Sequence, residues 1–148
     1  MKNRWVIGCL CVLMAGMVGC SVENGTEIET ENFTVNLRDW QWNALYRRYE
    51  CIINYPELSG GIYERGTVVG GVYIREKDQK GDVYEVLKSL PFLESIPHID
   101  GPYTRTISFD IAPRQVTFYI QSSDLSDSTD DLGNYEFKIT LLWEQKFR

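Results

Sequence analysis

The chain has 148 residues, of which 43% are hydrophobic, and its 15 basic and 21 acidic side chains give a formal net charge of −6 at pH 7. This length suits a signal segment and one domain, whose core is large enough to fold without a disulfide or a metal. The acidic balance argues against nucleic acid as a partner, because phosphates bind to positive surfaces, and against direct adhesion to anionic lipid headgroups.

Residues 1–19 have the layout of a secretory signal peptide. Lys2 and Arg4 give a positive start, and the run from Trp5 to Met17 carries no charge. This run is shorter than the about 20 apolar residues that a transmembrane helix needs. The segment therefore predicts export followed by cleavage, not a permanent membrane span.

The segment ends in Met17-Val18-Gly19-Cys20, which resembles the bacterial lipobox, where small residues precede a cysteine that becomes lipidated. The resemblance implies that Cys20 is a lipid anchor that ties the protein to a membrane. Several acyl chains on one residue, each contributing about 0.8 kcal/mol per buried methylene, suffice for stable anchoring. The alternative is an ordinary secretory signal near an unmodified Cys20.

Residues 20–32 begin with this cysteine and continue as an acidic segment. Four glutamates and few apolar side chains give a composition that cannot bury its own surface. We expect a flexible tether here. Ser21 and the acidic residues after it resemble the sorting and surface-export signals of Bacteroidetes lipoproteins, which implies the outer membrane or the cell surface as the location.

Residues 33–148 repeat one signal, in which short runs of alternating apolar and polar residues are separated by turn residues. This period of two is typical of β-strands with one buried face. One helical turn is expected between Leu58 and Ile62, closed by Gly66. We therefore predict an all-β domain, an antiparallel immunoglobulin-like β-sandwich of about seven strands. The strands are expected at Phe33–Leu37, with a second piece through Trp40 and Trp42, and at Arg47–Tyr55, Thr67–Arg75, Val83–Leu90, Tyr103–Ile111, Gln115–Gln121 and Tyr135–Trp143.

The same alternation predicts which side chains form the core and where the backbone is approached closely. Gly70 and Gly71 interrupt one strand, and glycine there indicates a bulge or a close contact with the backbone. The apolar faces of the last three strands assign five residues to the core, namely Phe109, Phe118, Phe137, Ile139 and Leu141.

The mature chain resembles a class of small Bacteroidetes lipoproteins that have an immunoglobulin-like β-sandwich. The resemblance lies in the Trp-rich first segment, the run ERGTVVGGVYI, the LPF segment at residues 90–92, and the final series YTRTISFDI, QVTFYIQSSD and YEFKITLLW. It implies a fold and a location. It brings no catalytic residue, and no cofactor motif is recognisable in the chain.

Cleavage would remove Cys9 and Cys11 and leave Cys51 as the one cysteine beyond the anchor, so we expect no intramolecular disulfide. Cys51 shares a strand face with Tyr49 and Ile53. We expect a buried, inert core thiol, and the alternative is a reactive nucleophile.

Aromatic residues give the candidate binding residues. Trp40 and Trp42 flank Gln41 and are expected to point the same way near the tether, where two rings offer a platform for a sugar or a protein. Tyr73 and Tyr119 are expected on the outer faces of their strands. The alternative is that one or both tryptophans cover the open end of the sandwich.

His98, the one histidine of the chain, lies with Asp100 in a loop bounded by prolines. A hydrolase needs such a base within hydrogen-bond reach of a nucleophile. No nucleophile elbow is recognisable, so we expect His98 to be an ordinary loop residue. A small hydrolase centred on His98 stays as the alternative.

An acidic loop precedes the last expected strand. Its carboxylates do not have the alternate spacing and central glycine of an EF-hand, so we expect a solvated turn and no metal site. The loop contains Asp124, Asp127, Asp130 and Asp131.

These observations favour an envelope-anchored, non-enzymatic binding or structural module with a glycan or protein partner and no cofactor. Two alternatives are open, namely the hydrolase centred on His98 and a subunit of a pilus-like surface assembly, which would present an unpaired edge strand.

Overall fold

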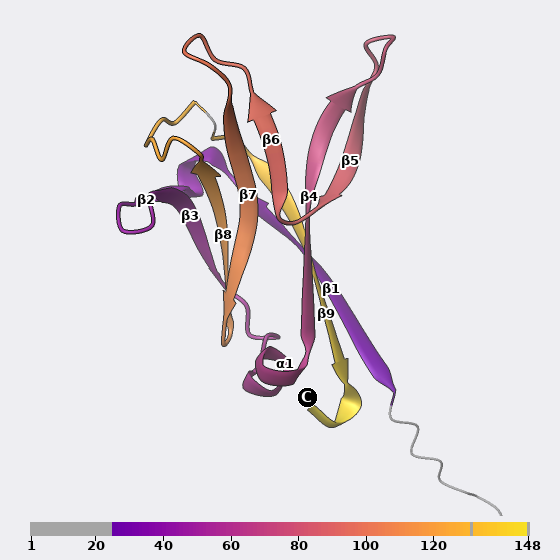
Figure 1. The fold of residues 1–148 in the computed structure, drawn as a ribbon. Coiled ribbons are helices and arrows are strands. Elements are labelled where there is room, and N and C mark those ends of the chain that lie inside the picture. Colours follow the sequence, from indigo (N-terminus) through magenta and orange to yellow (C-terminus); the bar gives the residue numbers. More distant parts are fainter. Residues whose placement is uncertain (1–24, 131, 148) are drawn as a thin grey trace, which may run out of the picture.

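The computed structural model describes residues 25–130 and 132–147, and the predicted signal peptide and Cys20 lie outside them. The described residues form two packed antiparallel sheets, which confirms the predicted β-sandwich (Figure 1). Within them the elements are β1 (Thr26–Val35), the 3-10 helix η1 (Leu37–Asp39), β2 (Gln41–Asn43), β3 (Arg48–Asn54), α1 (Gly60–Arg65), β4 (Thr67–Lys77), β5 (Val83–Ser89), β6 (Phe92–Ile96), β7 (Tyr103–Ala112), β8 (Gln115–Ser122), β9 (Tyr135–Glu144) and the 3-10 helix η2 (Gln145–Phe147).

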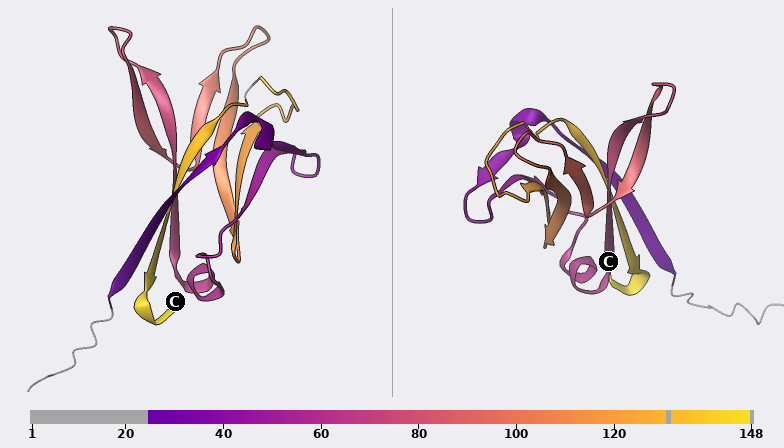
Figure 2. Two further views of the ribbon diagram at one scale, coloured as in Figure 1. Left: turned by 180° about the vertical axis from the view of Figure 1, so that it is seen from behind. Right: turned by 45° about the horizontal axis from the view of Figure 1, so that its top comes forward.

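The four-stranded sheet has the order β1-β9-β4-β5, and the five-stranded sheet has the order β2-β3-β8-β7-β6. The first and last strands are therefore neighbours, and they pair along all ten residues of β1. At one end of the sandwich, the β4–β5 and β6–β7 hairpins spread apart, and α1 lies near the other end (Figures 1 and 2).

The structure corrects the predicted tether, because residues 26–32 belong to β1. Residues that lie directly opposite each other on paired strands share a face, so Glu27, Glu29 and Glu31, which lie opposite Trp143, Leu141 and Ile139, are on the core-facing side of the sheet, where Glu27 and Glu29 are half-buried and Glu31 is exposed. Inward-pointing charges on an edge strand block its pairing with another chain. The glutamates that suggested disorder are thus compatible with a ten-residue edge strand.

The core lies between the sheets and is centred on two stacked rings. Phe118 and Phe137 are fully buried, with ring centroids 4.0 Å apart and an interplanar angle of 14°. Ile139 and Leu141 are also fully buried, as predicted. Phe109 is only half-buried, although it does pack against this core.

Gly70 is required by close packing between the sheets. A Cβ atom at this position would lie 2.3 Å from Cε1 of Phe109, which is far inside van der Waals contact. This confirms the close backbone approach predicted there. The predicted helical turn is also found, because α1 buries Ile62 and the N–H of Gly66 donates to the carbonyl oxygen of Ile62 at 2.7 Å.

The strand count is higher than predicted, with nine strands in the described part of the chain. One additional strand is β6. At its centre the usual order of buried apolar and exposed polar residues is reversed, since Leu93 is 60% exposed while Glu94 is half-buried and forms an ion pair with Arg105. The segment through Trp42 is a separate short strand, β2, which pairs only with residues 48–50 of β3. Within the described residues, no helix is long and apolar enough to cross a membrane.

Candidate functional site

Trp42 lies on the β2–β3 hairpin at the edge of the five-stranded sheet. This residue is half-buried, and its ring tilts against Tyr49, with centroids 5.0 Å apart. The hairpin is held in shape by Asn43, whose side-chain oxygen accepts hydrogen bonds from the N–H groups of Leu45 at 3.0 Å and Tyr46 at 3.2 Å. Trp42 is therefore presented by an ordered turn.

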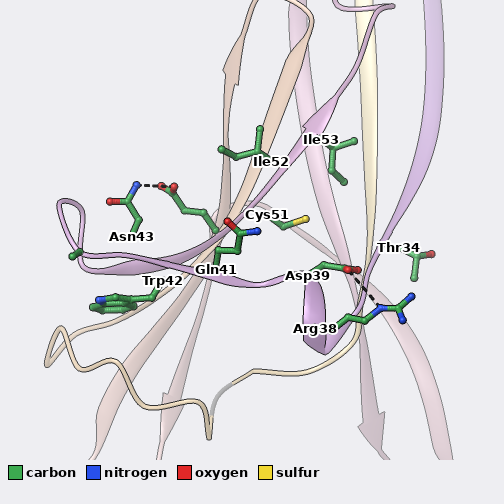
Figure 3. A pocket seen from close by; sticks show the side chains of 11 residues that line it. Thr34, Arg38, Asp39, Gln41, Trp42, Asn43, Cys51, Ile52 and Ile53 are labelled. Atoms are coloured by element: carbon green, nitrogen blue, oxygen red, sulfur yellow. Dashed lines mark hydrogen bonds and ion pairs between the residues drawn. The ribbon is translucent and has the colours of Figure 1, made fainter.

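Two hollows lie beside this hairpin and share Trp42 and Ala44 in their linings. The first, of about 720 Å³, extends along β3 to Ile53 and includes Thr34 of β1 (Figure 3). The second, of about 480 Å³, lies between the hairpin and the loop after β8, which contributes residues 124–127. We take the surface of these two hollows around Trp42 as the candidate site and refer to it as the Trp42 surface.

Trp40 does not share this surface. Its side chain is 7% exposed and packs edge-on against Tyr135 and Phe137, and its indole N–H donates to the carbonyl oxygen of Gly133 at 2.9 Å. Trp40 therefore belongs to the core and does not form an exposed platform with Trp42.

Tyr119 lies on the outer face of the five-stranded sheet, beneath an arginine. The guanidinium carbon of Arg48 is 4.0 Å from the Tyr119 ring centroid, and Arg48 also bonds the carboxylates of Glu50 and Asp110, each at 2.6 Å. Glu50 is 8% exposed and also accepts a hydrogen bond from the side-chain N–H of Asn43 at 2.8 Å. This cluster fixes β2 to β3 and thus helps to position Trp42.

The alternating pattern did not reveal this cluster, because Glu50 and Arg48 look like ordinary outward-facing charges. What makes them a cluster is the adjacent strand, where Tyr119 lies opposite Glu50 and its ring packs against the Arg48 guanidinium group.

Tyr73 lies on the outer face of the other sheet, opposite Glu136 and Leu87. It lines a separate hollow of about 610 Å³ together with Arg75 and Arg105. The structure therefore does not bring Tyr73, Tyr119 and Trp42 together at one site.

His98 lines a hollow of about 430 Å³ that also includes Asp100 and Ser123. The backbone N–H of Asp100 donates to Nδ1 of His98 at 3.3 Å, while the nearer carboxylate oxygen of Asp100 is 3.8 Å from Nδ1. In a Ser-His-Asp triad the carboxylate accepts a hydrogen bond from the Nδ1–H group, and a separation of 3.8 Å is too long for that bond.

The acidic loop is a turn held by its own hydrogen bonds. The backbone N–H of Ser126 donates to Asp124 at 3.0 Å, and this bond holds the pKa of the Asp124 carboxyl below its usual value. Asp131 lies outside the described residues. Among the residues that the structure describes, no group of three or more His, Cys, Asp or Glu side chains is arranged to hold a metal ion.

Cys51 carries a free thiol and lines the first hollow (Figure 3). It packs against the core, as predicted, but it is half-buried and not enclosed. Burial raises the pKa of the thiol, and the nearby Asp39 carboxylate raises it further. Cys51 is therefore a poor nucleophile at neutral pH, because only the thiolate reacts.

Labelling of Cys51 with iodoacetamide should be slow in the native protein at pH 7.5 and complete after denaturation in urea. Since the pKa is raised, the native rate should continue to rise above the pH at which an unfolded cysteine has become fully reactive. The measurement is the labelled fraction against time by mass spectrometry. Native labelling as fast as in urea would instead support a reactive thiol.

Comparison with protein-family models, curated proteins and solved structures finds no match to this chain. The class of the protein therefore follows from its fold, which is a small all-β sandwich.

Proposed function

We propose that the protein is an envelope-anchored, non-enzymatic binding module that recognises its partner through the Trp42 surface. The observation that carries this proposal is that the half-buried Trp42, on a well-ordered hairpin, lines two hollows. Tryptophan is enriched at binding hot spots because it combines a large apolar face with a polar N–H group.

The proposed anchor is consistent with the position of this surface. Residues 20–25 can span about 20 Å between a lipidated Cys20 and the start of β1. β1 begins near α1 and η2, and the β2–β3 hairpin lies on the far side of the molecule from that point in both figures (Figures 1 and 2). A partner would therefore reach Trp42 on the side away from the anchor.

The resemblance to Bacteroidetes lipoproteins with immunoglobulin-like domains supports the outer membrane or cell surface as the location.

The lipid on Cys20 is tested by intact mass. Protein extracted from membranes should begin at Cys20 and exceed the cleaved polypeptide by the mass of a diacylglyceryl group, with or without a further acyl chain. Replacing Cys20 by serine should release the protein from the membrane fraction. An unmodified N-terminus at another residue would contradict the anchor.

The binding role is tested by replacing Trp42 with alanine. Because Trp42 lies outside the core cluster, the variant should keep most of its unfolding free energy but lose most of its retention on the glycans or purified envelope proteins that bind the parent protein on an array. Loss of a hot-spot side chain weakens binding by about 2 kcal/mol or more.

Tyr63→Ala provides the matched control, since Tyr63 is an aromatic residue with 38% exposure on α1, away from the hairpin. It should leave retention unchanged. Equal retention of the parent and Trp42→Ala proteins would contradict the proposal, as would an equal loss with Tyr63→Ala.

The hydrolase alternative has one observation in its favour, which is the presence of His98, Asp100 and Ser123 around one hollow. The 3.8 Å separation between the Asp100 carboxylate and Nδ1 of His98 argues against it, because a triad needs a hydrogen bond there. If the alternative holds, the protein should hydrolyse p-nitrophenyl acetate, and both His98→Ala and Ser123→Ala should abolish that activity.

A further inference from the structure

The Trp42 surface continues along one end of the five-stranded sheet. The hollow beside His98 also includes Tyr103, and Asp124 lines both this hollow and the second hollow beside Trp42. Neighbouring hollows of this row share lining residues, the first two Trp42 and Ala44 and the last two Asp124.

The fold explains why these hollows are neighbours. β3 begins, β8 ends and β7 begins at the same end of the sheet, because neighbouring strands are antiparallel. The loop after β8 is tied to both sides, since the hydroxyl of Tyr49 donates to the carbonyl oxygen of Asp127 at 2.6 Å and the N–H of Ser123 donates to the carbonyl oxygen of Thr104 at 2.8 Å. The floor of the row is thus a fixed part of the sandwich.

The side chains along this row suit a sugar chain. Trp42 lines the first and second hollows, and Tyr103, which meets His98 edge-on with centroids 6.2 Å apart, lines the third. Between them are the carboxylates of Asp124 and Asp127. Aromatic rings pack on the C–H faces of sugars, and carboxylates accept hydrogen bonds from sugar hydroxyls.

We infer that the three hollows form one groove for a neutral oligosaccharide, with Trp42 under one sugar unit and Tyr103 under another. An acidic chain is disfavoured because two carboxylates, Asp124 and Asp127, face one guanidinium, Arg47, in the lining of the second hollow. Because the two rings line different hollows, we expect a ligand longer than a disaccharide. This inference rests on the proposed function, since it takes the Trp42 surface as a binding site.

The test is calorimetry on the full-length protein in detergent micelles, with disaccharides and hexasaccharides of α-1,4-glucose, β-1,4-glucose, β-1,4-xylose and β-1,4-mannose. For the sugar that binds, the hexasaccharide should bind about five- to tenfold more tightly than the disaccharide, as expected for one further aromatic contact. Tyr103→Leu should remove this gain and Tyr103→Phe should keep it. Trp42→Ala should weaken both ligands, and Tyr63→Ala should weaken neither.

The outcomes separate the two proposals. Binding that depends on Trp42 but not on chain length or Tyr103 would overturn the groove and leave the proposed function standing. Sugar binding that Trp42→Ala does not change would overturn both. Failure of all eight sugars to bind would overturn the inference of a neutral oligosaccharide.

Discussion

Replacing Phe118 by alanine should lower the free energy of unfolding by about 3 to 5 kcal/mol, the usual cost of removing a well-packed phenylalanine. Phe118 is fully buried, stacks on Phe137 and also contacts the ring of Phe33, with centroids 5.7 Å apart. Its removal would leave a cavity between the two sheets that neighbouring strands cannot fill without shifting. Urea unfolding followed by circular dichroism measures the loss.

Tyr63→Ala is the matched control, because it removes a partly exposed aromatic side chain from α1 and should change stability by less than about 1 kcal/mol. If Phe118→Ala also changes stability by less than about 1 kcal/mol, the strand register is wrong, since a shift by one residue would turn Phe118 outward.

A chain that begins at residue 33 should be several kcal/mol less stable than one that begins at residue 25. The shorter chain lacks residues 26–32, which pair with residues 138–144 of β9. At about 1 kcal/mol for each net hydrogen bond, the loss of this ladder removes a large part of the stability of a small domain. It also exposes the edge of β9.

Urea unfolding of the two chains side by side measures this difference. Both chains retain every residue of the described core, so the difference reports the strand residues that only the longer chain contains. Equal stability of the two chains would mean that residues 26–32 are a tether after all.

The sandwich and most of its core were predictable because alternation is strong in β7, β8 and β9. Phe118, Phe137, Ile139 and Leu141 all occupy the predicted face. β1 was missed over residues 26–32 because its inward positions are glutamates, and composition alone favours disorder there. β6 was missed because Leu93 points outward and Glu94 inward.

The candidate site was predictable only in part. Trp42 was found from its residue type, but the burial of Trp40 depends on the end of η1 and the start of β2, which alternation does not reveal. The row from Trp42 to Tyr103 joins residues that are far apart in the sequence, so it depends on the pairing of β3, β8 and β7. Local sequence patterns carry no such information.

The indole N–H signals of the mature full-length protein, recorded by ¹⁵N–¹H correlation spectroscopy in detergent micelles, test the role of Trp42 most directly. Trp42 is assigned by the signal that Trp42→Phe removes, and the buried Trp40 and Trp143 serve as internal references. On addition of the hexasaccharide that binds in calorimetry, the Trp42 signal should shift in proportion to occupancy while the other two stay in place. Saturation of binding with no change at Trp42 would contradict the account.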